Sequence, residues 1–154
     1  MADRKESVLT SLQIVCFKIG NEEYGIDILQ VQEILRMPKI TKLPKSLKYI
    51  MGVIDLRGKV IPIVALSEKF GLGHKDHESC TRVIVVDIGG KQVGMAIDSV
   101  SHVIRVDSSD IEPPPPVVKG IAGKYIVGIA KLDKGFVVIL DIHQIFSKEE
   151  LTSM

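Results

Sequence analysis

The chain has little of several things that mark specialised classes of protein. It contains no tryptophan, and only 5% of its 154 residues are aromatic, so side chains on which nucleic acid bases could stack are scarce. Its two cysteines, Cys16 in an apolar run and Cys80 in a polar stretch, are too few for a disulfide framework, which favours a reducing cytoplasm. Its net charge is only +1, so no overall field attracts it to nucleic acids or anionic membranes.

Long hydrophobic runs are absent as well. No apolar stretch approaches the roughly 18 residues that a membrane-spanning helix requires, so we expect no direct membrane insertion. The stretch MADRKESVLTSLQ is polar and does not have the apolar centre of a signal peptide. What is present is the composition of an ordinary globular protein, with 45% hydrophobic and 25% charged residues.

The chain contains an internal repeat. VCFKIGNEEYGIDILQVQEILR, residues 15–36, aligns with IVVDIGGKQVGMAIDSVSHVIR, residues 84–105, at a constant offset of 69. IMGVIDLRGKVIPIVALSEKF, residues 50–70, aligns with IVGIAKLDKGFVVILDIHQIF, residues 126–146, at an offset of 76. The offset changes at the Pro/Gly-rich stretch EPPPPVVKGIAGK, where insertions are easily tolerated. Two structural copies of one unit explain this pattern.

Each copy is predicted to contain two hairpins of short strands. The first hairpin turns at Gly20-Asn21 or at Gly89-Gly90, and a short helix is predicted to follow it, at 27–35 or 98–104. The second hairpin covers 52–66 or 128–142, and a short helical turn at 67–70 or 143–146 ends each copy. About five short strands per copy favour a small barrel, in which Pro62 should lie at an edge or a bulge.

The two copies are expected to pack against each other. A unit of about 60 residues is marginally stable alone, and runs such as LQIVCFKI and RVIVVDI are typical of strands that are covered on both faces. We therefore predict an all-β chain of two tandem five-stranded β-barrels that share a hydrophobic core, with short helices. The predicted domain covers residues 11–148, with subdomains at about 11–72 and 81–148, a linker at about 73–80 and flexible termini at 1–10 and 149–154.

The sequence carries no catalytic pattern. Its Gly-rich stretches fit neither a phosphate loop nor a dinucleotide fingerprint. His74, His77 and Cys80 are the best metal-ligating candidates, but they fall short of the four ligands of a closed zinc site, so a metal-binding linker stays an alternative. His102 and His143 stand alone and are interpreted as solvated or hydrogen-bonded side chains. We predict no enzymatic activity and no cofactor, which leaves recognition of partners.

A basic stripe is the one feature that points towards nucleic acid. Positive charges recur every third residue from Arg36 to Lys48, without an acidic residue between Glu33 and Asp55. This stretch has one aromatic residue, Tyr49, beside it and therefore offers no series of platforms for bases. We expect a solvated strand edge there and no nucleic acid partner.

Two motifs resemble the CheW family of chemotaxis coupling proteins. EEYGIDILQVQEIL, residues 22–35, and GVIDLRGKVIPIVAL, residues 52–66, match the Y-G-I and L-R-G-x-x-(I/V)-P blocks of that family, and the resemblance covers roughly residues 11–148. It implies two SH3-like five-stranded barrels without catalytic activity. It further implies a cytoplasmic adaptor that couples the tips of chemoreceptors to the regulatory domain of the chemotaxis histidine kinase, in arrays at the inner face of the membrane. The same module in another receptor–kinase pathway fits the sequence equally well.

The resemblance also implies a receptor-binding surface, whereas no kinase-binding residue is identified. The family positions of this surface correspond here to Val31, Glu33, Gly52 and Arg57, with Ile34 and Ile50 as apolar neighbours.

Arg57 raises the sharpest question within this surface, because a hairpin turn needs Gly58 but no arginine. The hypothesis is that Arg57 forms an ion pair with Glu33, on the predicted helix, and so fixes the surface. Alternatively, Arg57 only caps backbone carbonyl groups or pairs with Asp55. The family often has asparagine at the position of Asp55. Copy two keeps the hairpin but has His102 at the position of Glu33 and Asp133 at the position of Arg57, so the barrel itself needs neither charge.

Overall fold

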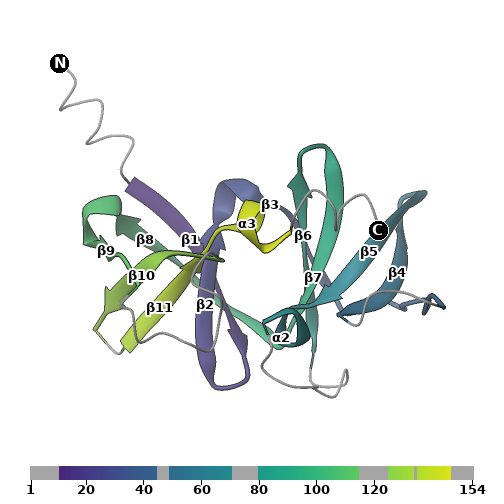
Figure 1. Cartoon of the computed structure of the whole chain (residues 1–154), viewed down its shortest axis with the longest axis horizontal. Coiled ribbons are helices and arrows are strands. Elements are labelled where there is room, and N and C mark those ends of the chain that lie inside the picture. Colours follow the sequence, from purple (N-terminus) through teal and green to yellow (C-terminus); the bar gives the residue numbers. More distant parts are fainter. Residues whose placement is uncertain (1–10, 45–48, 71–79, 115–124, 134, 147–154) are drawn as a thin grey trace.

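The computed structural model describes residues 11–44, 49–70, 80–114, 125–133 and 135–146, most of them in β-strands (Figure 1). The strands are β1 (Ser11–Ile19), β2 (Glu22–Asp27), β3 (Val31–Arg36), β4 (Ile50–Leu56), β5 (Lys59–Ala65), β6 (Arg82–Ile88), β7 (Lys91–Ile97), β8 (Ser99–Asp107), β9 (Ile111–Glu112), β10 (Ile126–Leu132) and β11 (Gly135–Leu140). The short helices are η1 (Ile28–Gln30), α2 (Leu66–Lys69), η3 (Ser108–Asp110) and α3 (Ile142–Ile145). None of these helices is long and apolar enough to cross a membrane.

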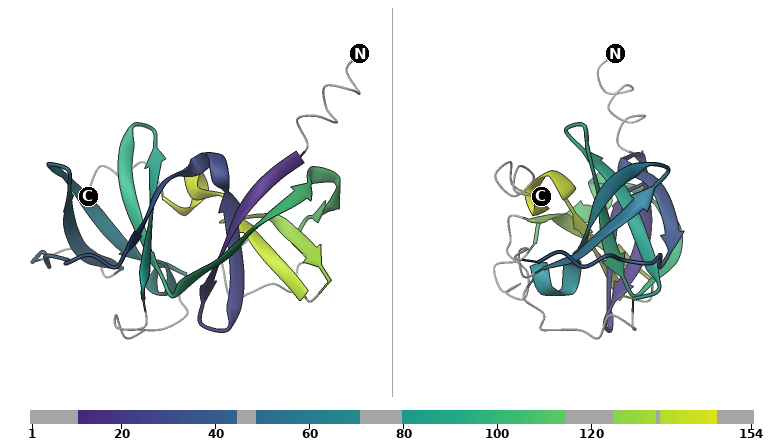
Figure 2. Two further views of the ribbon diagram at one scale, coloured as in Figure 1. Left: turned by 180° about the vertical axis from the view of Figure 1, so that it is seen from behind. Right: turned by 90° about the vertical axis from the view of Figure 1, so that its right-hand side faces the viewer.

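The strands form two sheets that curl into two barrels. One sheet has the order β3-β6-β7-β5-β4, and we refer to it as barrel I; the other has the order β8-β1-β2-β11-β10-β9, and we refer to it as barrel II. The barrels lie side by side along the long axis of the molecule, as Figure 1 and the view from behind in Figure 2 show. The predicted all-β pair of five-stranded barrels is confirmed, and the two-residue strand β9 adds a sixth member to barrel II.

Each barrel contains strands from both copies of the repeat. Barrel I combines β3, β4 and β5 of copy one with β6 and β7 of copy two, and barrel II combines β1 and β2 with β8–β11. The repeat is visible in the pairing, because the hairpins β1–β2 and β6–β7 occupy equivalent places in the two sheet orders. The halves 11–72 and 81–148 therefore do not coincide with the barrels: the strand that follows each hairpin pairs with the other hairpin, β3 with β6 and β8 with β1.

The helices predicted at 27–35 and 98–104 are largely wrong. Only Ile28–Gln30 forms a 3-10 turn, at whose start Asp27 Oδ1 accepts a hydrogen bond from the Leu29 N–H at 3.0 Å. The following residues form β3, and the second segment forms β8. Pairing with a strand of the other copy, β3 with β6 and β8 with β1, satisfies the backbone groups of both segments and overrides the local helical pattern. The short helical turns predicted at 67–70 and 143–146 are present as α2 and α3, each one residue earlier.

An apolar cluster between the barrels, the central cluster, forms the shared core. It contains Phe17 and Tyr24 of barrel II, Ile84 of barrel I, and buried side chains of α2 and α3. Each barrel also has its own interior cluster, and alternate residues of β1 face one or the other: Cys16 lies in the interior of barrel II, whereas Phe17 lies in the central cluster. This arrangement confirms the prediction that both faces of the apolar runs are covered.

Gly52 and Gly128 occupy equivalent places in β4 and β10. A Cβ atom on Gly52 would lie 2.3 Å from the carbonyl oxygen of Thr41, and one on Gly128 would lie 2.7 Å from that of Glu112. The two glycines thus let an extended segment approach closely and pair with the strand, Thr41 with Val53 and β9 with β10.

Pro62 lies inside β5 but outside the pairing of this strand with β7. It is paired with Val53 of β4, whereas the β5–β7 pairing begins at Ile63. The missing N–H group of the proline therefore costs no bond between β5 and β7, which agrees with the expectation of an edge-like position.

The exchange of strands predicts that neither half of the chain folds alone. Fragments 1–76 and 77–154 should each show no cooperative unfolding, because each lacks strands of both barrels. When the two fragments are produced together, they should co-purify and regain one cooperative transition, measured by circular dichroism in urea. Cooperative unfolding of either fragment alone would contradict this prediction.

The Gly52→Ala substitution should destabilise the chain by about 3 kcal/mol, since the new Cβ atom overlaps backbone atoms and the residue has a φ of +150°. Gly90→Ala is the matched control: Gly90 has a φ of +90° but nothing lies within 4 Å of the new Cβ, so only backbone strain of about 1 kcal/mol is expected. Urea unfolding measures both losses. Equal losses would show that the close approach of Thr41 contributes nothing.

Candidate functional site

Arg57 lies at the tip of the β4–β5 hairpin, in a conformation that arginine rarely adopts. Leu56 pairs with Lys59, so Arg57 and Gly58 form a two-residue turn with φ values of 51° and 85°. Glycine and asparagine are the usual residues at such positive φ values, and arginine there is strained. Asp55 Oδ1 accepts a hydrogen bond from the Gly58 N–H at 2.9 Å and so closes the turn. The turn explains Gly58 and Asp55 but not Arg57.

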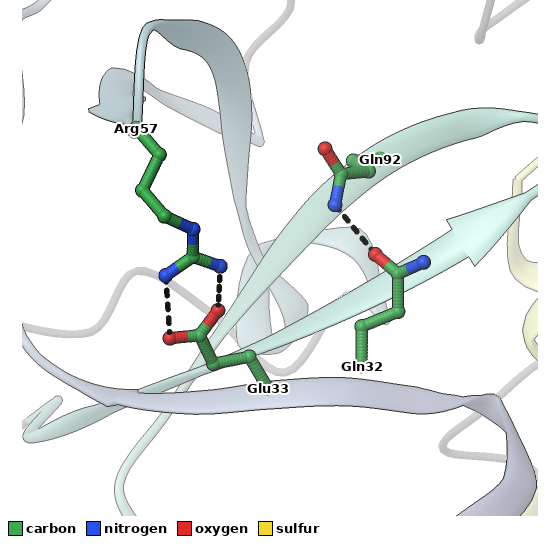
Figure 3. A network of polar contacts seen from close by, with 4 residues as sticks. All are labelled: Gln32, Glu33, Arg57 and Gln92. Carbon is green, nitrogen blue, oxygen red and sulfur yellow. Dashed lines mark hydrogen bonds and ion pairs between the residues drawn. The ribbon is translucent and has the colours of Figure 1, made fainter.

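The side chain of Arg57 reaches Glu33 on β3 (Figure 3). The Nη2 atom lies 2.5 Å from Oε1 of Glu33, and Nη1 lies 3.3 Å from Oε2, which makes the pair bidentate. β3 and β4 are the two outer strands of the sheet of barrel I, so the pair links one edge of the sheet to the hairpin at the other edge. The predicted Glu33–Arg57 pair is therefore present, but Glu33 lies on a strand rather than on a helix.

The ion pair shifts the pKa of both partners. The hydrogen bonds that Arg57 donates hold the pKa of Glu33 below its ordinary value, although partial desolvation acts in the opposite direction. The hydrogen bond to Glu33 raises the pKa of Arg57. The side chain of Arg57 is 71% exposed, so salt screens the pair and it contributes little to folding. Its main physical effect is to orient the guanidinium group.

A second polar contact lies beside the ion pair and was not predicted. Gln92 Nε2 on β7 donates to Gln32 Oε1 on β3 at 2.6 Å (Figure 3), and Gln32 Nε2 donates to Asp87 Oδ2 at 3.4 Å. Gln32 lies at a register shift of β3 against β6. These residues, together with Lys59 and Val60, line an open groove. Sequence reasoning missed the groove because it depends on the pairing of strands from different copies.

The other residues predicted for the receptor surface do not form one patch. Val31 and Ile50 are half-buried and pack against the central cluster, at the boundary between the barrels. Ile34 is 42% exposed, but it follows Glu33 in β3 and so points to the opposite face. Gly52 is buried, and it shapes the hairpin through its contact with Thr41. The structure thus brings Glu33 together with Arg57, and it places Val31 and Ile50 each against the central cluster.

The predicted metal candidates in the linker are only partly described. His74 and His77 lie outside the described residues. Cys80, expected in a polar loop, is instead buried in the interior cluster of barrel I with Met51, Val83 and Ala96. Its place in an apolar core separates it from the solvated setting in which a linker site was expected.

The fold and the site define a class of protein, a chain of two interleaved β-barrels around one shared core with an exposed ion pair at a hairpin tip. The family model described as the CheW-like domain matches residues 13–150. This chain therefore belongs to the CheW-like domain family.

Individual relatives agree with the family. The chain is 34% identical over 146 residues to the chemotaxis protein CheW of Treponema pallidum, a match that covers 92% of this chain and 86% of that protein. It is 36% identical over 139 residues to the chemotaxis protein CheW of Klebsiella aerogenes, with 90% and 84% covered. The crystal structure of the scaffolding protein TtCheW from Thermoanaerobacter tengcongensis aligns with a TM-score of 0.81 at 39% identity, over 90% of each chain.

The ion pair predicts a lowered pKa for Glu33 that depends on Arg57. In an NMR pH titration, the carboxyl group of Glu33 should titrate below the ordinary range, and Arg57→Asn should return its pKa to that range while asparagine preserves the turn. Because the folded pKa is lowered, the contribution of the pair is present above the unfolded pKa and is lost as the pH falls through the folded pKa.

Lys59→Gln is the control for this titration. It removes a positive charge from the same hairpin without touching the hydrogen bonds to Glu33, so the pKa of Glu33 should stay low. An ordinary Glu33 pKa in the unsubstituted chain would mean that the pair does not form in solution.

Proposed function

We propose that this chain is a non-enzymatic chemotaxis scaffold that couples chemoreceptors to the chemotaxis histidine kinase. Membership of the CheW-like family supports this proposal, as do relatives that are named chemotaxis and scaffolding proteins. The proposed place of action is the cytoplasm, in receptor arrays at the inner face of the membrane, without a cofactor. The observation that carries the proposal is the exposed Glu33–Arg57 pair, which holds a guanidinium group ready on the surface.

A pre-oriented arginine favours recognition for two physical reasons. The bidentate pair with Glu33 restricts the side chain of Arg57 before a partner arrives, so less conformational entropy is lost on binding. Arginine is also enriched among the residues that dominate interface energies. We therefore assign Arg57 to direct contact with the receptor and Glu33 to holding it in place.

The surroundings of the pair fit a helical partner such as a receptor tip. The groove beside the pair has an apolar element, Val60, and a polar rim that includes Gln32 and Gln92. A helix that lays its apolar face into such a groove would meet the charged pair at the rim. Val31 and Ile50 would extend the contact towards the boundary between the barrels, and Gly52 would act by shaping the hairpin. Ile34, on the opposite face of β3, would contribute indirectly.

Coupling also needs a second surface for the kinase. Val60 and Phe136 occupy equivalent positions in β5 and β11, and their side chains are 71% and 62% exposed. Val60 belongs to the same hairpin as Arg57, whereas Phe136 lies on the other barrel. We therefore assign Phe136 to the kinase side, so that receptor and kinase can bind at the same time.

A pull-down with a receptor signalling fragment and the kinase from the same genome tests this division. Arg57→Asn should lose receptor binding at least about tenfold and keep kinase binding, and Phe136→Ser should do the reverse. Lys39→Gln, which removes an exposed positive charge between β3 and β4 and outside the lining of the groove, should bind both partners normally. Receptor-dependent kinase activity should be lost in both single variants.

Different failures have different meanings in this experiment. If the unsubstituted chain binds neither partner, the proposed function is wrong. If Arg57→Asn couples receptor to kinase normally, the function stands but the assignment of Arg57 is wrong. If Phe136→Ser binds the kinase normally, the kinase surface lies elsewhere.

A further inference from the structure

Barrel II brings together three donor side chains that lie far apart in the sequence. Cys16 on β1 is paired with His102 on β8 and with Gly25 on β2. Glu23 precedes Gly25 by two residues, so its side chain lies on the same face of the sheet as those of Cys16 and His102. One donor atom of each of the three residues lies within 4.8 Å of the other two. His102, which seemed isolated in the sequence, thus has two potential co-ligands in space.

One donor atom of this cluster lacks the partner that its burial demands. Glu23 Oε1 is buried and accepts no hydrogen bond from the described residues. The Nδ1 atom of His102 lies 3.6 Å from it, which is beyond hydrogen-bonding distance. An unpaired buried carboxylate oxygen is costly and is rare in native proteins. A cation between Glu23, His102 and Cys16 would remove that cost.

The cluster runs from the interior of barrel II to its surface. Cys16 is fully buried in the interior cluster, the side chain of Glu23 is 24% exposed, and that of His102 is 50% exposed. Glu23 and His102 line a hollow together with Leu132, Asp133, Gly135 and Phe136. A cation in the hollow would therefore reach Glu23 and His102 first, and the sulfur atom of Cys16 lies within 4.8 Å of a ligand atom of each.

The other copy of the repeat shows that the barrel does not need these donors. The positions of Cys16, Glu23 and His102 correspond to Val85, Gln92 and Glu33, and Asp133 corresponds to Arg57. In barrel I, Glu33 and Arg57 form the ion pair, and Gln92 is hydrogen-bonded to Gln32. Barrel II has potential metal ligands at all of these positions, and one of their atoms, Glu23 Oε1, lacks a hydrogen bond from the described residues.

We propose that Cys16, Glu23 and His102 form a binding site for a divalent cation of the zinc class. A thiolate, an imidazole and a carboxylate form a ligand set that suits Zn²⁺, whereas Mg²⁺ and Ca²⁺ prefer oxygen ligands alone. Three protein ligands leave a fourth position, which faces the hollow and is open to water or to the carboxylate of Asp133. Bound metal would tie β8, β1 and β2 together at the mouth of barrel II.

Binding requires that the thiol of Cys16 loses its proton. Burial, together with the nearby charge of Glu23, raises the pKa of Cys16 to about 12, so the thiol is neutral without metal. The cation replaces this proton, which passes to the solvent. Loss of the proton leaves a thiolate on Cys16. If Co²⁺ binds in place of Zn²⁺, this thiolate should give a thiolate-to-metal absorption band.

The test is a titration of the chelator-treated full chain with Zn²⁺ alone, in competition with a chromophoric chelator. One Zn²⁺ should bind per chain and raise the melting temperature. His102→Gln and Glu23→Gln should each weaken binding by more than about tenfold. Both changes are mild, because His102 is half-exposed and copy two already has glutamine, Gln92, at the position of Glu23.

Three further variants show which residues hold the metal. Cys16→Val, which copies Val85 of the other barrel, should abolish the Co²⁺–thiolate absorption band. The control His143→Gln removes an exposed histidine of α3, and the double variant His74→Gln/His77→Gln removes the linker donors; both should bind Zn²⁺ normally. Absence of Zn²⁺ binding, binding unchanged by His102→Gln and Glu23→Gln, or binding lost in the linker double variant would each overturn the proposal. Neither receptor nor kinase takes part, so the result is independent of the proposed function.

Discussion

The central cluster is the constraint on which the rest of the structure depends. It joins both barrels with α2 and α3, and much of the sparse aromatic content of the chain lies in or beside it. The ring of Tyr24 lies 6.2 Å from that of Phe17 and 5.9 Å from that of Phe70, which in turn lies 5.8 Å from Tyr125. β1 and β6 each present one face to this cluster and the other to a barrel interior. A movement of one barrel against the other would therefore expose both apolar hairpins, and the surfaces on the two barrels are held at a fixed separation.

A rigid, repeated frame allows the surface of each copy to diverge. The buried glycines Gly52 and Gly128 have the same structural role in the two copies: each lets an extended segment approach its strand closely. Outside the core, equivalent positions carry different chemistry. The ion pair of barrel I is replaced in barrel II by His102 and by Asp133. Since both sets of side chains fit the same frame, the frame does not dictate these side chains, and the proposed function assigns the two barrels to different partners.

The sequence predicted the repeat, the hairpins and the short helices α2 and α3, because each leaves a local pattern of turn residues and apolar spacing. It could not predict the exchange of strands, because the same alignment results whether β3 pairs with its own hairpin or with the other. Ile28, Val31 and Leu35 are spaced as on a helix, yet Val31 and Leu35 also fit one face of a strand, as they do in β3. The Glu33–Arg57 pair followed from family resemblance, whereas the contact of Cys16 with Glu23 and His102 depends on a register that only the folded sheet shows.

The backbone at Arg57 connects the fold to recognition. An asparagine or glycine would form the same turn with less strain, and Asp133 at the equivalent position does not adopt a positive φ. At this one position, the left-handed conformation is therefore not a requirement of the repeated hairpin, since it occurs at Arg57 and not at Asp133. An exposed ion pair returns little stability to the folded state. A local strain that folding does not repay is typical of functional positions. The strain at Arg57 thus favours a role in binding over a role in folding, independently of the family to which the chain belongs.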